Sequence, residues 1–563
     1  MKSIQSLSIG LAAVMALTTA TACVDLDEKI VAGVTADYYE QPEGFEAAVN
    51  AAYAGLWHLY GQERDMTFLE YGTDIWAGGA DGSRKQWNTY DARIDPRETW
   101  LRDIWNDVYR HINTTNAVVG RAANLDPAVV DEATKTLRVA EARFLRALYY
   151  FYLLRYFGDI PISLEETTTV TNQARRAPVA EVYSTVIIPD LEAAIQALPP
   201  TADPGRATKG AAQHLLALAL LYRNEPGDAE RAEQLAKEVI NSGVYSLMPK
   251  YSDIWTLENE AGPEVVFSLQ STNDPLTRSS GNRWHLYWGM VYDLEPGMTR
   301  TLEYGRPFRR LRPSGYMLDS LWDRSIDDRY DLSFNHVWFS NSANRPEGME
   351  LGDTAIFLPK VKTSELDQAV YCGKPYVIYT EPDDFWNAKA NPIPNCSNVK
   401  GEYNPSKFPV LNKYLDPTRL SLNEEISQRD FLVYRLAETY LLVAEALVRQ
   451  GKLDEAAEYV NAVRVRAAKP GFEEEMKVTA ADMSLEFILA ERGRELFGEG
   501  HRWFDLVRFG KLVEYVRARN MDAAPNIQDY HTLRPIPQSQ IDLTRNEDGT
   551  PFPQNPGYGV AEE

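Results

Sequence analysis

The sequence has little cysteine and a deficit of positive charge. Only Cys23, Cys372 and Cys396 occur in 563 residues, and the formal net charge is −23. Nucleic-acid binding depends on a positive surface that displaces counterions from phosphates, so this function is excluded. The same deficit disfavours adsorption to an anionic membrane surface. We expect the negative charge to keep an exposed protein soluble.

The sequence also lacks the short motifs of common catalytic sites. It has no Gly-x-Ser-x-Gly elbow, no His-Glu-x-x-His pair and no phosphate-binding Gly-Lys-Ser/Thr loop. Its seven histidines are scattered singly, and no acidic run has the ligand spacing of a Ca²⁺ loop. Among 81 acidic residues, carboxylate pairs like those of glycosidases arise by chance. We therefore predict no catalytic residues, no metal, no cofactor and no enzymatic activity.

The start of the chain has the features of an export signal. Lys2 supplies a positive charge, Ile9–Ala16 is apolar, and small residues lead up to Cys23. This segment is too short to span a membrane and is typical of a cleaved signal peptide. No later run approaches the roughly 18 apolar residues that a membrane-spanning helix needs.

A cysteine directly after small residues resembles a bacterial lipobox, in which the cysteine becomes the acylated N-terminus. We therefore predict a lipoprotein signal peptide over residues 1–22, lipidation of Cys23, and a tether over residues 23–40. Lipid would then be the only membrane anchor. Ordinary signal cleavage close to an incidental cysteine is the alternative interpretation.

The two remaining cysteines are predicted to form a disulfide. An exported protein enters an oxidising compartment, in which paired cysteines are normally oxidised. Cys372 and Cys396 lie 24 positions apart. Closing such a loop stabilises the folded chain by roughly 3 kcal/mol in the chain-entropy model. A metal site is disfavoured because no histidine or further cysteine lies nearby.

Apolar residues recur at helical spacing over most of the two ends of the chain. The pattern predicts helices at residues 45–59, 100–112, 131–157, 179–197, 211–222, 229–242, 431–450 and 453–467. Short turns join 211–222 to 229–242 and 431–450 to 453–467, as in tetratricopeptide-like helical hairpins. A helical pair cannot bury its apolar face alone, so stacked neighbours are expected. The predicted fold class is mostly α, an α-solenoid of such hairpins.

The middle of the chain has a different composition. Residues 249–430 are rich in Pro, Gly, Asn, Asp and aromatics, and only Glu264–Gln270 reads clearly as a strand. Long irregular segments in compact proteins are usually functional or disordered. We predict an ordered, loop-rich variable region with short strands that binds ligand. It lies between a helical region at 41–248 and a helical C-terminal region with a tail at 431–563.

Two loop segments combine aromatic and hydrogen-bonding side chains. Sugars present flat C–H faces that rings can cover, while Asp, Asn and Arg pair with hydroxyl groups. Tryptophan and tyrosine on loops are less readily assigned to a core than those on helices. The predicted ligand-binding residues are Asp74, Trp76, Trp87, Asn88 and Tyr90 in the first segment, and Arg283, Trp284, Tyr287 and Trp288 in the second. Each ring taken alone is more simply a core residue, and a peptide would suit such a surface too.

Several longer motifs resemble the SusD/RagB family of nutrient-binding outer-membrane lipoproteins. They are RFLRALYYFYLLRYFGDIPIS at 143–163, RDFLVYRLAETYLLVAEALVRQGKLDEAAEYVNAVRVRA at 429–467, LEFILAERGRELFGEGHRWFDLVRFGKL at 485–512, LRPIP at 533–537 and QNPGY at 554–558. Their order and spacing make the resemblance specific, and it spans nearly the whole chain. In the segment 485–512, Glu491, Arg492, Arg494 and Glu495 are expected to form paired charges on an inward helix face, a structural role.

The resemblance implies a fold and a function. The fold is four tetratricopeptide-like hairpins that support a variable, loop-rich region. The function is capture of glycans, or of peptides in some branches, at the cell surface, where the protein covers a SusC-like TonB-dependent transporter. The expected location is the outer membrane, lipid-anchored and facing outwards. A peptide-binding member of the family and a surface glycosidase are the alternatives.

Overall fold

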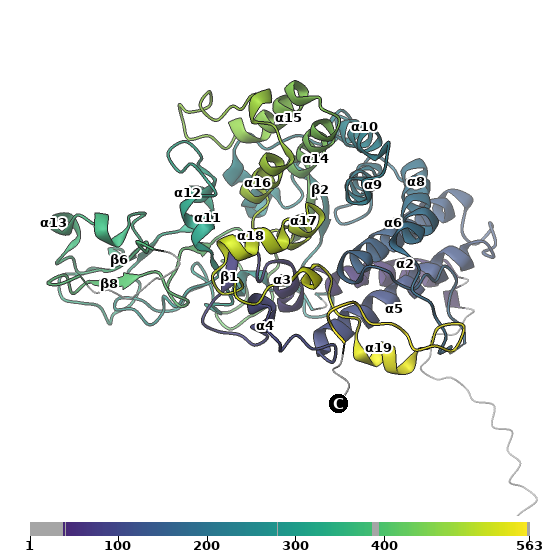
Figure 1. The fold of residues 1–563 in the computed structure, drawn as a ribbon, viewed down its shortest axis with the longest axis horizontal. Coiled ribbons are helices and arrows are strands. Elements are labelled where there is room, and N and C mark those ends of the chain that lie inside the picture. The colour runs from purple at the N-terminus through teal and green to yellow at the C-terminus, as the bar shows by residue number, and fades with distance from the viewer. Residues whose placement is uncertain (1–37, 40, 170, 279, 385–392, 560–563) are drawn as a thin grey trace, which may run out of the picture.

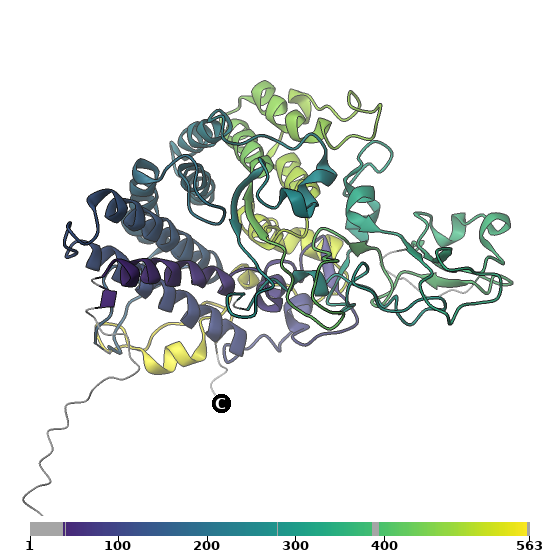
Figure 2. The same ribbon diagram turned by 180° about the vertical axis from the view of Figure 1, so that it is seen from behind.

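Helices form a curved layer at one end of the molecule, and a small lobe containing short strands lies at the other (Figures 1 and 2). The computed structural model describes residues 38–39, 41–169, 171–278, 280–384 and 393–559. The predicted signal peptide and Cys23 lie outside the described residues. A large hydrophobic cluster runs through the helical layer and the loops packed against it.

The N-terminal helices match the predicted periodicity. They are α2 (Pro42–Ala54), α5 (Thr99–Ala122), α6 (Glu132–Phe157) and a continuous helical run formed by α7 (Val179–Val182), η3 (Tyr183–Ile187) and α8 (Ile188–Ala197). Asp131 caps α6 by accepting a hydrogen bond from the Thr134 amide at 2.9 Å, and Gly158 ends the helix with φ +70°. Helix α6 packs against α2, α5 and α8, which makes it central to this part of the core.

Both predicted helical hairpins are present. The first pairs α9 (Lys209–Arg223) with α10 (Asp228–Ile240), and the second pairs α14 (Leu436–Arg449) with α15 (Leu453–Val465). Helix α10 packs against α9 and against α14, so hairpins that are far apart in sequence stack on each other. This stacking buries the apolar faces that neither hairpin covers alone.

The helix predicted over residues 431–450 is wrong at its start. Phe431–Arg435 forms strand β10, which pairs antiparallel with β2 (Val265–Leu269). These five residues are buried. Four of them are large apolar or aromatic side chains, a composition that suits a strand covered on both faces. A short apolar run directly before an amphipathic helix continues the apolar pattern of that helix, so the sequence alone does not separate β10 from α14. The pairing places β2, near the start of the variable region, against the first residues of the C-terminal region.

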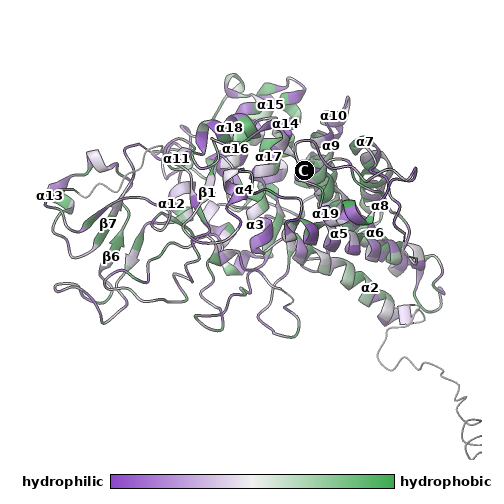
Figure 3. Ribbon diagram, turned by 60° about the horizontal axis from the view of Figure 1, so that its bottom comes forward, coloured by the Kyte–Doolittle hydropathy of each residue, from purple (hydrophilic) through white to green (hydrophobic). Residues whose placement is uncertain are grey.

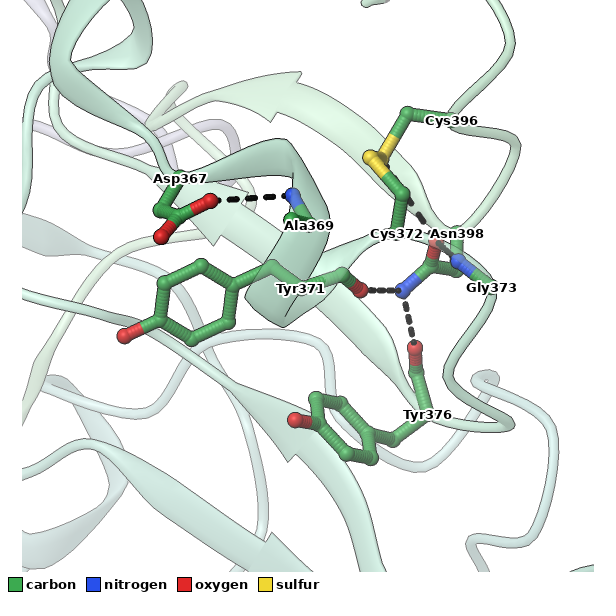
Figure 4. Close-up of a disulfide and its surroundings, with 8 residues drawn as sticks. All are labelled: Asp367, Ala369, Tyr371, Cys372, Gly373, Tyr376, Cys396 and Asn398. Carbon is green, nitrogen blue, oxygen red and sulfur yellow. Dashed lines mark hydrogen bonds between the residues drawn. A yellow bond between two sulfur atoms is a disulfide. The ribbon is translucent and has the colours of Figure 1, made fainter.

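The lobe is described over residues 337–384 and 393–402, and it contains the largest sheet of the described part of the chain. Its strands β5 (Val337–Phe339), β6 (Thr354–Phe357), β7 (Val377–Thr380) and β8 (Val399–Glu402) lie in this order, with β5–β6 antiparallel and the other pairs parallel. Cys372 and Cys396 form the predicted disulfide within it. The Asn398 side-chain amide donates to the carbonyls of Tyr371 and Tyr376 beside the disulfide (Figure 4). The lobe has its own small core around Leu366, Ile378 and Val399.

The remaining elements are short. They are η2 (Gly55–His58), α3 (Glu63–Leu69), β1 (Trp76–Gly78), α4 (Gln86–Thr89), η4 (Tyr251–Trp255), η5 (Leu257–Asn259), η6 (Trp284–Leu286), β3 (Leu311–Pro313), α11 (Gly315–Asp319), α12 (Arg329–Ser333), β4 (Phe334–Asn335), η7 (Thr363–Glu365), α13 (Gln368–Tyr371), β9 (Val410–Leu411), η8 (Ala480–Asp482), α16 (Leu485–Glu495), α17 (Arg502–Arg508), α18 (Leu512–Arg519), η9 (Asp529–Thr532) and α19 (Gln538–Leu543). The variable region is therefore loop-rich with short strands, as predicted.

The helices carry both hydrophilic and hydrophobic residues along their length (Figure 3). Such helices turn an apolar stripe to the core and a polar face to water. Among the described residues, no helix combines the length and the apolar character that crossing a membrane requires.

Removal of the disulfide is expected to destabilise the lobe. Replacing both Cys372 and Cys396 by alanine frees a loop with a sequence separation of 24. The chain-entropy model assigns such a loop about 3 kcal/mol of stabilisation. Because the lobe has a separate core, we expect faster amide hydrogen exchange in β7 and β8 and little change in α6 and α14. Equal exchange rates in the variant and the parent protein would contradict this expectation.

Candidate functional site

The aromatic residues predicted to stack on a ligand lie in the core. The six rings are at most 2% exposed: Trp76, Trp87, Tyr90, Trp284, Tyr287 and Trp288. The rings of Trp76 and Trp288 are 4.5 Å apart, and Trp284 packs edge-on against Phe431 at 4.7 Å. A ring with so little exposed surface presents no face to a ligand in this structure, so burial does not support the predicted ligand contact of these six residues. They instead hold the two loops against the helices.

Two of the predicted polar residues are also buried. The Asp74 carboxylate accepts two hydrogen bonds from Arg502, both at 2.7 Å, and one from Arg519 at 3.2 Å. The Asn88 amide donates to Asp522 at 3.1 Å. Neither Asp74 nor Asn88 is more than 2% exposed, so direct contact with a ligand is not possible for them as placed. Through these hydrogen bonds, Asp74 orients Arg502 and Arg519, and Asn88 orients Asp522.

Arg283 is the exception among the predicted residues. Its side chain is 37% exposed, and its Nη1 lies 3.6 Å from Oε2 of Glu425. Its role in ligand binding stays a prediction.

A polar cavity lies above the buried Asp74 layer. We call it the binding cavity; its volume is about 310 Å³. It is lined by Ala77, Arg312, Ser314, Gly315, Tyr316, Asp319, Ser320, Lys362, Asp383, Asp384, Ala518, Arg519, Asn520 and Met521. These residues come from β1, β3, α11, the lobe and the end of α18, elements that meet between the helical layer and the lobe (Figure 1). Concave sites with converging polar groups are the usual place for small ligands.

The floor of the binding cavity is held by backbone pairing and by caps. Strand β1 pairs antiparallel with β3, with Trp76 opposite Pro313. Ser314 then caps α11: its hydroxyl oxygen accepts from the Met317 amide at 3.2 Å, while the hydroxyl donates to the Asp74 carbonyl at 2.6 Å. This fixes the direction of α11 relative to β1.

The end of α18 is fixed in the same way. Asn520, directly after the helix, donates to the carbonyls of Thr73 and Trp76, at 2.7 and 3.1 Å. The wall that carries Arg519 and Asn520 is therefore tied to the strand that carries Ala77. Preorganised walls reduce the cost of ordering side chains when a ligand binds.

Tyr316 is the aromatic ring of the binding cavity. The Arg519 guanidinium lies 4.1 Å from the centre of the Tyr316 ring and 3.6 Å from that of Tyr515. These cation–π contacts hold the Tyr316 ring in place. Burial, followed by the nearby Asp74 carboxylate, raises the pKa of Tyr316 above its ordinary value. The hydroxyl therefore stays protonated at neutral pH and is able to donate a hydrogen bond.

The charges that line the binding cavity are balanced. Arg312 pairs with Asp522 at 3.1 Å, Lys362 with Asp319 at 3.5 Å, and Arg519 with Asp74 at 3.2 Å. Each of these cations thus has an acidic partner, and the cavity holds no excess of positive charge for an anion. Such a site suits an uncharged ligand with many hydroxyl groups and one apolar face. In the described ranges, no cluster of three or more His, Cys, Asp or Glu side chains has the geometry to hold a metal ion.

Three of the residues predicted from the sequence lie in the layer under the binding cavity, and none of them lines it. Asp74, Trp76 and Asn88 were predicted, and each contacts a lining residue or its immediate neighbour. Tyr316 and Arg519 are separated by about 200 positions and share no local motif. No local pattern in the sequence marks these two residues as neighbours.

Comparison with known proteins gives matches along nearly the whole chain. The family described as "SusD family" matches residues 385–558, and the family described as "Starch-binding associating with outer membrane" matches residues 40–221. The chain is 27% identical to SusD-like protein P2 of Formosa agariphila over 97% of this chain and 98% of that protein. It is 28% identical to the starch-binding protein SusD of Bacteroides thetaiotaomicron over 75% of this chain and 73% of that protein.

Solved structures agree with these matches. A structure described as a laminarin binding SusD-like protein superposes with a TM-score of 0.68 at 24% identity, covering 92% of this chain and all of that one. The predicted mostly α fold with short strands is thereby confirmed.

Proposed function

Because the chain belongs to the SusD/RagB family, we propose that it is a cell-surface lipoprotein that binds nutrient oligosaccharides and delivers them to a SusC-like TonB-dependent transporter. The family is one of non-catalytic binding proteins, which agrees with the prediction that the chain is not an enzyme. Two of its relatives are named for binding starch and laminarin, both of which are uncharged polysaccharides. This supports an oligosaccharide as the ligand.

The observation that carries the proposal is the composition of the binding cavity. It combines one fixed ring, Tyr316, with paired charges that present hydrogen-bond donors and acceptors. The ring would cover the C–H face of a sugar. Arg312, Asp319 and Asp383 would bond its hydroxyl groups. Asp383 is already oriented by the backbone amide and hydroxyl of Ser364, which donate to it at 2.9 and 2.7 Å.

The lipid anchor and the location are part of the same proposal. The export signal and the lipobox-like Cys23 support attachment to the outer membrane through acyl chains. Mass spectrometry of the N-terminal peptide tests this: we expect an acylated Cys23 as the first residue. An unmodified N-terminus at another residue would contradict it.

Tyr316→Ala is expected to weaken oligosaccharide binding at least tenfold. Its removal takes away the ring that would cover the sugar, and buried aromatic contacts are commonly worth 2 kcal/mol or more at the centre of a site, as a rough value. The measurement is calorimetric titration of the purified protein with oligosaccharides from starch and laminarin and with peptides. Phe339→Ala is the matched control, because this ring is 49% exposed and lies in the lobe away from the binding cavity.

The titration also separates the alternatives. Each mixture is assayed afterwards for cleavage products, since a glycosidase releases shorter sugars and a binding protein does not. Binding of peptides alone would replace the oligosaccharide proposal by peptide capture. Equal affinities for the parent protein and Tyr316→Ala would show that the binding cavity is not the ligand site.

A further inference from the structure

A second cavity lies within the helical layer and shares no lining residue with the binding cavity. We call it the helical cavity; its volume is about 460 Å³. It lies mainly among α6, η3, α9 and α17, and Leu154, Tyr183, Phe504 and Val507 form apolar parts of its wall. Mostly apolar cavities with a few polar groups are typical of small-ligand sites. The polar groups of this cavity determine what it would bind.

Arg155, on α6, brings a positive charge to the helical cavity, and none of the described residues is an acidic partner for it. Its guanidinium lies 3.8 Å from the centre of the Phe504 ring and 4.2 Å from that of Phe151. Its Nε donates to the Phe151 carbonyl at 3.1 Å. Among the described residues, Arg155 forms no ion pair with a carboxylate, and its polar side-chain partner is the Tyr222 hydroxyl. Ring faces and a neutral hydroxyl group stabilise a cation without cancelling its charge.

Arg508, on α17, is a second arginine in the wall of the helical cavity. Its side chain is 2% exposed, and it pairs through Nη1 with Glu445 at 2.6 Å and through Nε with Asp505 at 3.0 Å. Its buried Nη2 has no hydrogen-bond partner in the described structure. A buried donor without an acceptor costs roughly 1–3 kcal/mol. The two ion pairs nevertheless compensate the charge of Arg508.

The other charged residues of the helical cavity compensate each other. Arg223 pairs with Asp228 at 2.5 Å and with Glu225 at 3.5 Å. Among the described residues, Arg155 is therefore the cation of this wall that has no acidic partner. A carboxylate has two oxygens and one negative charge, and it forms strong charge-assisted bonds with guanidinium groups.

We propose that the helical cavity binds a carboxylate that is attached to an apolar or aromatic group. Arg155 compensates its charge, and the apolar walls cover its body. Two sources have this chemistry, a free organic acid and the C-terminal residue of a polypeptide. The proposal does not depend on oligosaccharide binding, because the two cavities share no residue.

The test compares acids with their amides by calorimetric titration of the purified protein. The probes are 3-phenylpropanoate, N-acetyl-phenylalanine and N-acetyl-phenylalanine amide. We expect at least one acid to bind at least tenfold more tightly than the amide, which has the same apolar body without the charge. Preference for N-acetyl-phenylalanine over 3-phenylpropanoate would indicate a polypeptide C-terminus. The reverse would indicate a free acid.

Arg155→Gln is expected to remove the preference for the acid over the amide. Tyr316→Ala, in the binding cavity, is the control and should leave that preference unchanged. The acid–amide comparison on the parent protein remains decisive if Arg155→Gln does not fold. Equal binding of acid and amide, or no heat from either at millimolar concentration, would overturn the proposal. Loss of oligosaccharide binding with acid binding intact would affect only the proposed function.

Discussion

Trp284→Ala is expected to lower the free energy of unfolding by about 3–5 kcal/mol, because it removes a large ring from a packed core. The ring is fully buried and packs edge-on against Phe431 and Tyr414, at 4.7 and 5.3 Å. Its Nε1 donates to the Asp65 carboxylate at 3.0 Å. The substitution would leave a cavity and would remove a hydrogen bond from a buried carboxyl group, and both effects are destabilising.

Urea unfolding followed by circular dichroism measures this effect. Phe339→Ala provides the comparison. This ring is 49% exposed, so its removal should lower the free energy of unfolding much less. Trp284→Phe keeps most of the side-chain volume, so its loss in free energy of unfolding should lie between those of Trp284→Ala and Phe339→Ala. The result also separates two roles for Trp284. A stable Trp284→Ala protein that has lost oligosaccharide binding would return this ring to the ligand site, and an unstable one agrees with its place in the core.

Glu495→Ala is also expected to lower the free energy of unfolding by about 3–5 kcal/mol, because it breaks a buried ion-pair network. The Glu495 carboxylate is fully buried and accepts from Arg435 at 2.7 Å, Arg466 at 2.6 Å and Arg329 at 2.9 Å. Without it, three guanidinium groups that are at most 6% exposed lose a shared anion. The charges of buried arginines cannot be relieved by deprotonation at ordinary pH.

The same substitution is expected to change the acid dependence of stability. Burial alone would raise the pKa of Glu495, but Arg435, Arg466 and Arg329 lower it to about 2. The unfolded chain binds the proton at about 4.3, the ordinary glutamate value. The stabilisation is therefore complete above that pH and is lost as the pH falls towards 2. Glu495→Ala should flatten the stability profile over this window.

Glu486 offers a matched control on the same helix. Its side chain is 65% exposed and pairs with Lys511 at 2.9 Å on the surface. Exposed ion pairs contribute little, so Glu486→Ala should unfold at a urea concentration close to that of the parent protein. Similar losses for Glu486→Ala and Glu495→Ala would show that the buried network is not what stabilises this helix.

Local patterns in the sequence were sufficient to predict many of the helices and the disulfide. Helical spacing predicted α6, α9, α10 and α15 closely, because an amphipathic helix repeats its apolar residues within a few positions. Of the paired charges expected within the segment 485–512, the Arg494–Glu491 pair is local, whereas Arg329 and Glu438, distant in sequence, are partners of Glu495 and Arg492. Cysteine scarcity and the export signal were sufficient to predict the Cys372–Cys396 disulfide. The predicted start of the helix that contains α14 was wrong, because a short apolar run fits a buried strand and a buried helix equally well.

The ligand site could not be predicted in this way. Whether Trp76 or Trp284 faces a ligand or the core depends on what packs over the loop, and burial is a property of contacts between distant segments. The binding cavity brings Ala77, Tyr316, Lys362 and Arg519 together from four segments, through strand pairing and caps that no local pattern records. The sequence by itself determined the family, the helical hairpins and the disulfide, which arise from short-range periodicity and motif order. Only the tertiary structure decided which polar groups converge on a cavity and which aromatic rings are buried, because both depend on chain segments that meet only after folding.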